Sequence, residues 1–333
     1  MPDSPERCER GHRAVATPFL SGYNSIGEQE MAAHYPRVIT VPIASVTNGV
    51  ATSESDELSV EEPLEIQVSA AGESSPVPLA VTMRTPGDDA ELAAGFLFTE
   101  GIVQNRAEIV DLRPLGDNAI LAALAPGAGL DSTRFERHTF VSSSCGVCGK
   151  RSIAAVFALK KYSSPPGTPR IESQVVDGLP RTQREAQAAF QRTGGLHAAA
   201  LFDSQGNLLA LYEDVGRHNA LDKLVGSELL AGRIPLADRI LFLSGRASFE
   251  LIQKASMAGI PVVAAVGAPS TLAVALARDS SITLLGFVRD GRFNVYADAG
   301  RLTQTPAELF PVPQRAHSTP ILEDTADDAD TRG

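Results

Sequence analysis

The chain has 333 residues, 43% of them hydrophobic and 21% charged, a balance typical of a water-soluble globular protein large enough for two domains. Its 29 basic and 40 acidic residues give a formal net charge of −11, which argues against non-specific binding to nucleic acid. The longest apolar stretch, 259–266, is too short to span a bilayer, and the N-terminus lacks the apolar region of a secretory signal, so a cytoplasmic protein is predicted.

Both terminal segments are predicted to be disordered. Residues 1–36 mix serine, proline, glutamate and arginine without a sustained apolar period, and residues 304–333 are first proline-rich and then acidic. Segments with so few apolar residues cannot offset the entropy that is lost on ordering. We interpret the acidic end as a solvated tail, while a docking segment is the alternative.

Residues 37–140 are predicted to form a smaller β-rich N-terminal domain with one helix. Alternating or β-rich runs at 64–68 and 78–83 are typical of strands. The helix is expected over 88–99, with Asp88 as its N-cap and Glu91 completing a capping box. Its apolar stripe, expected to pack in the core, contains Leu92, Ala93, Phe96 and Leu97.

Residues 152–303 alternate between strand and helix patterns and predict an α/β domain. Such alternation indicates a largely parallel sheet with helices on both faces, and ligands bind beyond the carboxyl ends of its strands. The turn 203–206 joins the first two strands as a hairpin. Helices are expected at 152–162, 217–230, 248–257 and 271–277, and strands at 196–201, 208–212, 240–243, 260–266, 282–287 and 293–296.

Two strand ends combine glycine with hydroxyl residues just before a helix. They are Ser244-Gly245-Arg246-Ala247-Ser248 and Gly267-Ala268-Pro269-Ser270-Thr271. Unpaired N–H groups at a helix N-terminus favour an anion, and the guanidinium of Arg246 suits phosphate. Ordinary N-capping by Ser248 and Ser270 would explain the same residues. Two such loops at one sheet edge favour a site for a phosphorylated ligand.

A third strand end, residues 213–219, is crowded with polar and charged side chains. Arg217, His218 and Asn219 are expected in the first helical turn, where a cation opposes the helix dipole. A bound anion or Asp214 would offset that cost, and such a local conflict points to a functional site. The chain has no Walker motif and no G-x-G-x-x-G, so a nucleoside triphosphatase or an NAD enzyme is unsupported.

Cys145 and Cys148 form a C-x-x-C pair in the loop 141–151, whose small neighbours predict an exposed thiol site. A structural zinc site needs four ligands, and the six histidines are scattered singly, so no metal is expected. A zinc nucleotide deaminase needs H-x-E upstream of P-C-x-x-C. Here Ser144 replaces that proline, and the nearest candidate, His197, lies downstream without the carboxylate.

Three interpretations of the thiol pair remain open. A thioredoxin-like redox pair fits because a helix is expected after Cys148. A persulfide carrier fits because glycines give the loop reach, and Lys150 and Arg151 favour the thiolate. An inert pair in a surface loop is the third.

Taken together, these motifs resemble the formate dehydrogenase accessory sulfurtransferase family, FdhD. The resemblance runs in order from about Val38 to Tyr296 and is strongest in the string 213–223, Glu-Asp-Val-Gly-Arg-His-Asn-Ala-Leu-Asp-Lys. It also includes residues 85–88, 95–96, 99–102, 145–149, 244–246, 286–289 and 294–296.

The resemblance implies a sulfurtransferase. Family members take sulfur from a cysteine desulfurase as a persulfide on the C-x-x-C loop. They pass it to the molybdenum or tungsten bis(pterin guanine dinucleotide) cofactor, the substrate for sulfuration, before formate dehydrogenase receives it. By this resemblance Cys145 would form the persulfide and Cys148 would be its partner.

The resemblance also implies a cytidine-deaminase-like three-layer C-terminal domain without zinc, and a homodimer. It places the cofactor in the stretch Phe287, Val288, Arg289, Asp290, Gly291 and Arg292. The strand ends add Arg217, His218, Ser244, Gly245 and Arg246 to the expected binding residues. Two rival functions remain, a dithiol oxidoreductase using both cysteines and a cofactor-binding chaperone without sulfur chemistry.

Overall fold

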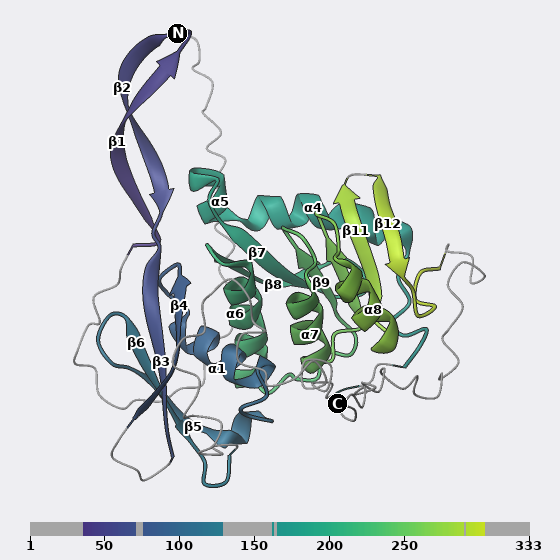
Figure 1. The fold of residues 1–333 in the computed structure, drawn as a ribbon. Helices are drawn as coiled ribbons and strands as arrows, with labels where there is room; N and C mark the ends of the chain where they lie inside the picture. The colour runs from purple at the N-terminus through teal and green to yellow at the C-terminus, as the bar shows by residue number, and fades with distance from the viewer. Residues whose placement is uncertain (1–35, 71–75, 129–161, 163–164, 290, 304–333) are drawn as a thin grey trace, which may run out of the picture. The chain divides into compact units, whose positions relative to one another are not determined.

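The strands that the structure describes form a two-stranded, a four-stranded and a six-stranded sheet (Figure 1). The computed structural model describes residues 36–70, 76–128, 162, 165–289 and 291–303. The predicted leader, the acidic tail, the thiol loop and the helix expected at 152–162 lie outside these ranges, apart from Pro36 and Tyr162. None of the described helices is both long and apolar enough to cross a membrane.

The β-rich part begins with an antiparallel hairpin of β1 (Val38–Thr47) and β2 (Val50–Ser59). Asn48 and Gly49 join the two strands with φ angles of 52° and 81°, the left-handed backbone of an Asn-Gly hairpin turn. The four-stranded sheet that follows confirms the strands predicted at 64–68 and 78–83. It contains β3 (Glu62–Ala70), β4 (Val77–Arg84), β5 (Ile109–Pro114), which follows the short 3₁₀ helix η1 (Arg106–Glu108), and β6 (Ala119–Leu124), in the order β4-β3-β6-β5.

The predicted helix of this part is present as α1 (Asp89–Thr99), but its predicted capping box is wrong. Asp88 has a left-handed backbone with φ of 56°, and its side chain makes no capping hydrogen bond. The carboxylate pairs with Arg37 instead, a distant residue that local sequence does not reveal. Three residues of the predicted stripe are buried, whereas Phe96 is only partly buried.

The C-terminal part confirms every strand and helix predicted between 196 and 296, to within two residues at each end. Its strands are β7 (His197–Phe202), β8 (Leu208–Asp214), β9 (Ile240–Leu243), β10 (Val262–Ala265), β11 (Thr283–Arg289) and β12 (Arg292–Ala297). Its helices are α4 (Ser173–Ala186), α5 (Ala188–Thr193), α6 (Arg217–Leu230), α7 (Phe249–Met257) and α8 (Thr271–Asp279).

The six-stranded sheet is mixed, and the prediction of a largely parallel sheet is wrong. Its order is β12-β11-β10-β9-β7-β8, and only β9, β10 and β11 run parallel to one another. The other three strands pair antiparallel with their neighbours. The turns between β7 and β8 and between β11 and β12 are short, so each of these two pairs must be antiparallel, because a parallel neighbour needs a long crossover.

Helices α4 and α5 were not predicted from the sequence. The interior of α4 contains Gly178 and Pro180, residues that disfavour a helix. Tertiary contacts hold it in place, because Val176 and Leu179 are fully buried against the sheet. The Gln183 side chain also donates a hydrogen bond to the Phe242 carbonyl at 3.1 Å.

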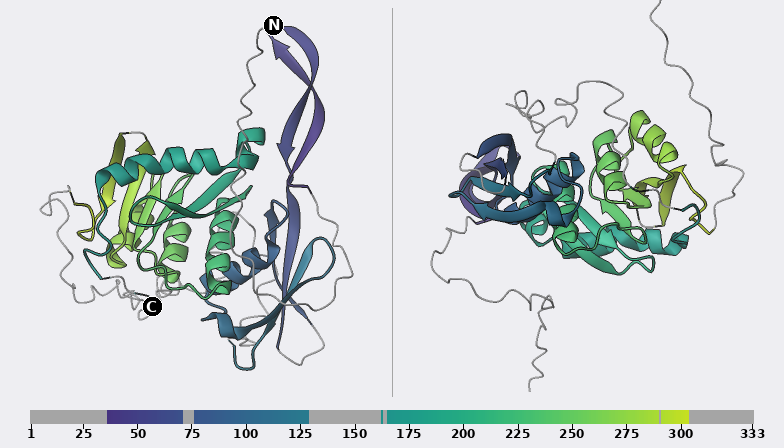
Figure 2. Two further views of the ribbon diagram at one scale, coloured as in Figure 1. Left: turned by 180° about the vertical axis from the view of Figure 1, so that it is seen from behind. Right: turned by 90° about the horizontal axis from the view of Figure 1, so that it is seen from below.

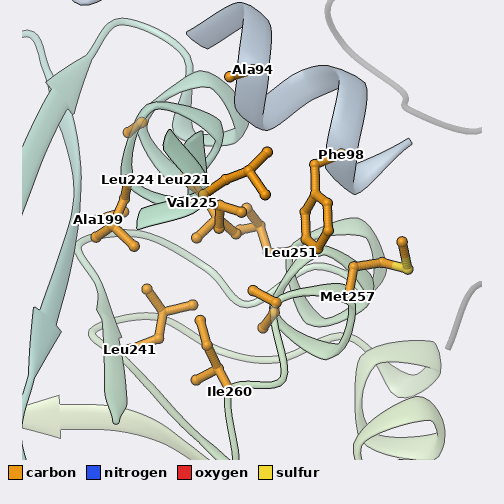
Figure 3. Packing of buried hydrophobic residues seen from close by; sticks show 14 of the residues in the cluster. Ala94, Phe98, Ala199, Leu221, Leu224, Val225, Leu241, Leu251, Met257 and Ile260 are labelled. Atoms are coloured by element: carbon orange, nitrogen blue, oxygen red, sulfur yellow. The ribbon is translucent and has the colours of Figure 1, made fainter. Parts of the chain in front are cut away.

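Helices cover both faces of the six-stranded sheet and give three layers (Figure 2). On one face Phe202 and Phe242 of the sheet pack with α4, and their rings meet edge to face at 6.5 Å. On the other face Leu241 belongs to a buried cluster with side chains of α1, α6 and α7, among them Phe98 and Leu221 (Figure 3). The predicted α/β class, with a β-rich N-terminal part and an α/β C-terminal part, is confirmed.

Candidate functional site

One edge of the six-stranded sheet gathers the predicted strand-end loops. Strands β9, β10 and β11 end there, and β7 begins there because Ala199 of β7 lies opposite Leu243 of β9. Strand β8 also ends there, because Asp214 pairs with His197. We call this region the carboxyl edge; it contains His197, Arg217, His218, residues 244–248, residues 267–270 and Phe287.

The two glycine- and serine-containing loops lie side by side, as predicted. The Gly267 N–H donates to the Gly245 carbonyl at 2.9 Å, and the Ala247 N–H donates to the Ala268 carbonyl at 3.2 Å. The Phe287 N–H donates to the Gly267 carbonyl at 3.2 Å, which joins β11 to the same pair of loops. Three strand ends are therefore held together by main-chain hydrogen bonds.

Glycines make this close approach possible. A Cβ on Gly286 would lie 2.9 Å from both the Pro269 ring and the Tyr296 ring, and one on Gly267 would lie 3.0 Å from the Arg246 backbone. A Cβ on Gly245 would lie 3.4 Å from the His197 ring. Glycine at these positions thus lets the strand-end loops pack directly against backbone.

Phe287 has an unusual backbone at this edge. Its φ angle is 53°, a left-handed value that is costly for a bulky side chain and that clusters at functional sites. The register of β11 against β12 shifts between Gly286 and Arg289, so Phe287 lies in an irregular segment of the strand. Its side chain is 36% exposed.

The rest of the predicted cofactor stretch forms the hairpin between β11 and β12. Val288 is buried in the core, whereas Arg289, Gly291 and Arg292 are exposed and the two arginines pair across the hairpin. Asp290 lies outside the described residues. The exposed guanidinium groups are the members of this stretch that a ligand can reach.

Arg217 occupies the first turn of α6, as predicted. Its Nε atom is buried and has no hydrogen-bond partner within the part of the chain that the structure describes. Asp214 does not compensate it, because that carboxylate forms its ion pair with Lys223 at 2.8 Å. A buried donor without an acceptor is unfavourable, and a bound anion would satisfy it.

The charged string 213–223 divides into structural and exposed residues. The Glu213 carboxylate accepts the N–H groups of Ala189 and Phe190 at 3.1 and 2.8 Å and so caps α5. Both oxygens of the buried Asp214 are fully used. They accept from Thr85 N–H, Gly216 N–H, Asn219 Nδ2 and Lys223 Nζ. Asp214 therefore fixes α6 against the β-rich part, and Arg217 and His218 remain at the carboxyl edge.

The two serines considered as helix caps behave differently. Ser270 accepts the Ala273 N–H at 3.2 Å and is an N-cap of α8. Ser248 makes no capping hydrogen bond; its hydroxyl donates to Glu250 Oε2 at 3.2 Å. His218 Nε2 lies 3.1 Å from the same Glu250 oxygen and 3.4 Å from the Ser248 hydroxyl. The hydrogen bond with His218 holds the pKa of Glu250 below its usual value. The same contact joins α6 to α7 at this edge.

Ser244 and Arg246 complete the predicted set. The Ser244 hydroxyl accepts the Ala198 N–H at 2.8 Å, so it fixes the loop to β7. Arg246 is exposed and free to contact a ligand at the surface of the edge. The structure therefore brings Arg217, His218, Ser244, Gly245, Arg246 and Phe287 to one place.

His197 is a member of this edge that sequence reasoning assigned no role. In the sequence it is an isolated histidine before an apolar strand, and its antiparallel pairing with β8 is not visible there. Burial lowers its pKa, and the nearby charges of Arg217 and His218 lower it further. The imidazole is therefore neutral at neutral pH.

No metal site is formed by the residues that the structure describes, since no group of three or more His, Cys, Asp or Glu side chains is arranged to hold an ion. Cys145 and Cys148 lie outside the described ranges, so this finding concerns the rest of the chain.

Fold and edge together define a three-layer α/β protein with a donor-rich surface at its strand ends. The chain belongs to the FdhD/NarQ family, whose model matches residues 59–303. A sulfur carrier protein FdhD from Streptomyces avermitilis is 46% identical over 270 residues, covering 78% of this chain and 94% of that protein. Another from Sulfolobus acidocaldarius is 40% identical over 262 residues, covering 79% and 97%.

A solved structure shares this fold. The crystal structure of a putative formate dehydrogenase accessory protein from Desulfotalea psychrophila matches with a TM-score of 0.60 at 24% identity. The match covers 78% of this chain and 96% of that one.

Proposed function

We propose that this protein is a sulfur carrier for a formate dehydrogenase, and that it binds a pterin guanine dinucleotide cofactor at the carboxyl edge. The observation that carries this is the buried Nε of Arg217, which has no partner among the described residues and lies beside strand ends that contain glycine. The chain is also 40–47% identical to proteins named sulfur carrier protein FdhD. The cofactor is the substrate to be sulfurated, as a molybdenum bis(molybdopterin guanine dinucleotide).

The sulfur would be carried as a persulfide on Cys145. In that step the Cys145 thiolate attacks the outer sulfur of a cysteine desulfurase persulfide. A new S–S bond forms on Cys145, the old S–S bond breaks, and the desulfurase thiolate leaves. Cys148, three residues away in the sequence, would assist delivery of the outer sulfur. The partners are then the desulfurase, the formate dehydrogenase apoprotein and a second copy of this chain.

The chemistry of the carboxyl edge supports binding of a nucleotide diphosphate. A phosphate oxygen would satisfy Arg217 Nε, and the exposed guanidinium groups of Arg246 and Arg289 would add charged hydrogen bonds. The exposed Phe287 ring offers a flat surface on which a guanine base can stack. Charged donors and an aromatic ring are components that such a ligand requires.

Calorimetry with guanosine diphosphate tests this assignment. A charged hydrogen bond is worth roughly 1.5–3 kcal/mol, so Arg246→Ala and Arg289→Ala should each weaken affinity by about one to two decades. Arg113→Ala is the matched control, because Arg113 is exposed on β5 of the four-stranded sheet and does not belong to the carboxyl edge. Unchanged affinity in both edge variants would show that the nucleotide binds elsewhere.

A further inference from the structure

His197 and His218 lie at the same edge but have different surroundings. His218 contacts a carboxylate, Glu250, at 3.1 Å. The His197 ring has no hydrogen-bond partner among the described residues and is only half-buried. Its Nδ1 and Cε1 atoms face Gly245, at 3.4 Å from where a Cβ would lie. Because residue 245 is glycine, it places no side chain over this side of the imidazole ring.

Positive charge surrounds His197 on the side of α6. Arg217 and His218 lie close enough to disfavour its protonation, and Asp214 of β8 opposes them more weakly. The loop after β9 contributes the uncharged Ser244 and Gly245, followed by the exposed Arg246. Asp214 is itself neutralised by Lys223 at 2.8 Å. The charges of the protein itself therefore disfavour protonation of His197.

An anion at the edge would reverse this balance. Its negative charge would screen Arg217 and His218 and would favour the imidazolium form. The protonated ring then has two N–H donors, and one of them can reach an oxygen acceptor. A neutral imidazole is more stable than an imidazolium beside the cations Arg217 and His218. We therefore expect His197 to be neutral in the free protein and protonated when an anion is bound.

We propose that His197 is a further phosphate-binding residue of this site, which donates a hydrogen bond from an imidazolium N–H to the bound nucleotide. The inference rests on the proposed nucleotide site. Binding would take up one proton from solvent, so that affinity for a nucleoside diphosphate would rise as pH falls. No residue of the thiol loop is involved, and sulfur loading should not depend on it.

Nuclear magnetic resonance of the histidine Cε1–H groups tests this in the wild-type protein. The chain has six histidines, and the His197 signal is assigned by its absence in His197→Gln. The midpoint of its titration should lie below the ordinary value of about 6.5 without ligand and should rise by about one pH unit or more with saturating guanosine diphosphate. An unchanged His197 titration in the saturated complex would overturn the proposal.

Calorimetry gives a second, independent readout. Between the free and bound pKa values of His197, affinity should fall up to about tenfold for each unit of rising pH. His197→Gln keeps a hydrogen-bond donor but cannot titrate, so the pH dependence of affinity that His197 contributes should vanish. The pH dependence caused by titration of the ligand's own phosphate should remain in both proteins. Identical pH profiles would refute the role of His197. No binding by wild type at any pH would instead refute the proposed nucleotide site.

Discussion

Gly95 of α1 and Gly226 of α6 face each other so closely that neither position has room for a methyl group. A Cβ on Gly226 would lie 1.8 Å from the Glu91 carbonyl oxygen, and one on Gly95 would lie 1.9 Å from the Asp222 carbonyl oxygen. The two helices therefore touch backbone to backbone. This contact joins the β-rich part to the helix that carries Arg217 and His218 to the carboxyl edge.

Gly226→Ala should strongly destabilise the protein, because α1 and α6 would have to separate. Overpacking of this kind costs about 3 kcal/mol or more when the neighbour is rigid backbone. Gly178→Ala is the control: it lies in α4 with open space around its Cβ position, and alanine is the better helix former by about 1 kcal/mol. Urea unfolding midpoints measure both. Equal midpoints for the two variants would contradict the close helix contact.

Lys254→Met should also destabilise the fold. Lys254 Nζ lies 2.9 Å from Asp222, 2.9 Å from Thr99 and 3.2 Å from Glu100. Removing the cation leaves Asp222 buried without its partner, which costs about 3–5 kcal/mol. Arg239→Ala, which breaks an exposed pair with Asp238, should cost about 1 kcal/mol or less.

The contribution of Lys254 should also depend on pH. Burial alone would lower its pKa, but Asp222 and Glu100 hold it above the usual value. The stabilisation is therefore complete below the unfolded pKa, about 10.4, and is lost as pH rises through the folded pKa. The difference in unfolding free energy between wild type and Lys254→Met should narrow at strongly alkaline pH. A difference that stays constant through this range would show that folding does not raise the pKa of Lys254.

Ser270→Ala and Ser248→Ala should differ in stability although both serines precede a helix. Ser270 caps α8 through the Ala273 N–H, so its loss should cost about 1 kcal/mol. The hydroxyl of Ser248 caps no N–H group and bonds to Glu250, so its loss should cost less. Thermal unfolding of the two variants measures the difference. A larger loss in Ser248→Ala would contradict the assignment of caps.

Local sequence predicted the elements well where periodicity decides them. Helix α6 begins and ends where its apolar pattern indicates, and the two strand-end loops meet as expected. Prediction failed where distant contacts decide. Asp88 does not cap α1 because its carboxylate pairs with Arg37. Helix α4 forms although it contains Pro180, and His197 lies at the carboxyl edge because β7 pairs antiparallel with β8. None of these contacts leaves a signal within a window of neighbouring residues.

The purified protein should contain no stoichiometric zinc at the thiol loop. Two cysteines cannot supply the four ligands of a closed site, although two loops of a dimer could combine their four sulfurs. Metal analysis of the wild type, with Cys148→Ser as the matched variant, decides between these arrangements. Zinc that is bound by the wild type and lost in Cys148→Ser would contradict the expectation.

Mass analysis after incubation with a cysteine desulfurase and cysteine tests the sulfur-carrier assignment most directly. The peptide that contains Cys145 should gain the mass of one or more sulfur atoms, and Cys145→Ala should gain none. Cys148→Ala should impair sulfur delivery, whereas Cys8→Ala should behave as wild type, and Arg246→Ala should still load. An internal disulfide without added sulfur would favour a dithiol oxidoreductase, and unmodified thiols would favour a chaperone. Normal loading and delivery by Cys145→Ala would contradict the account.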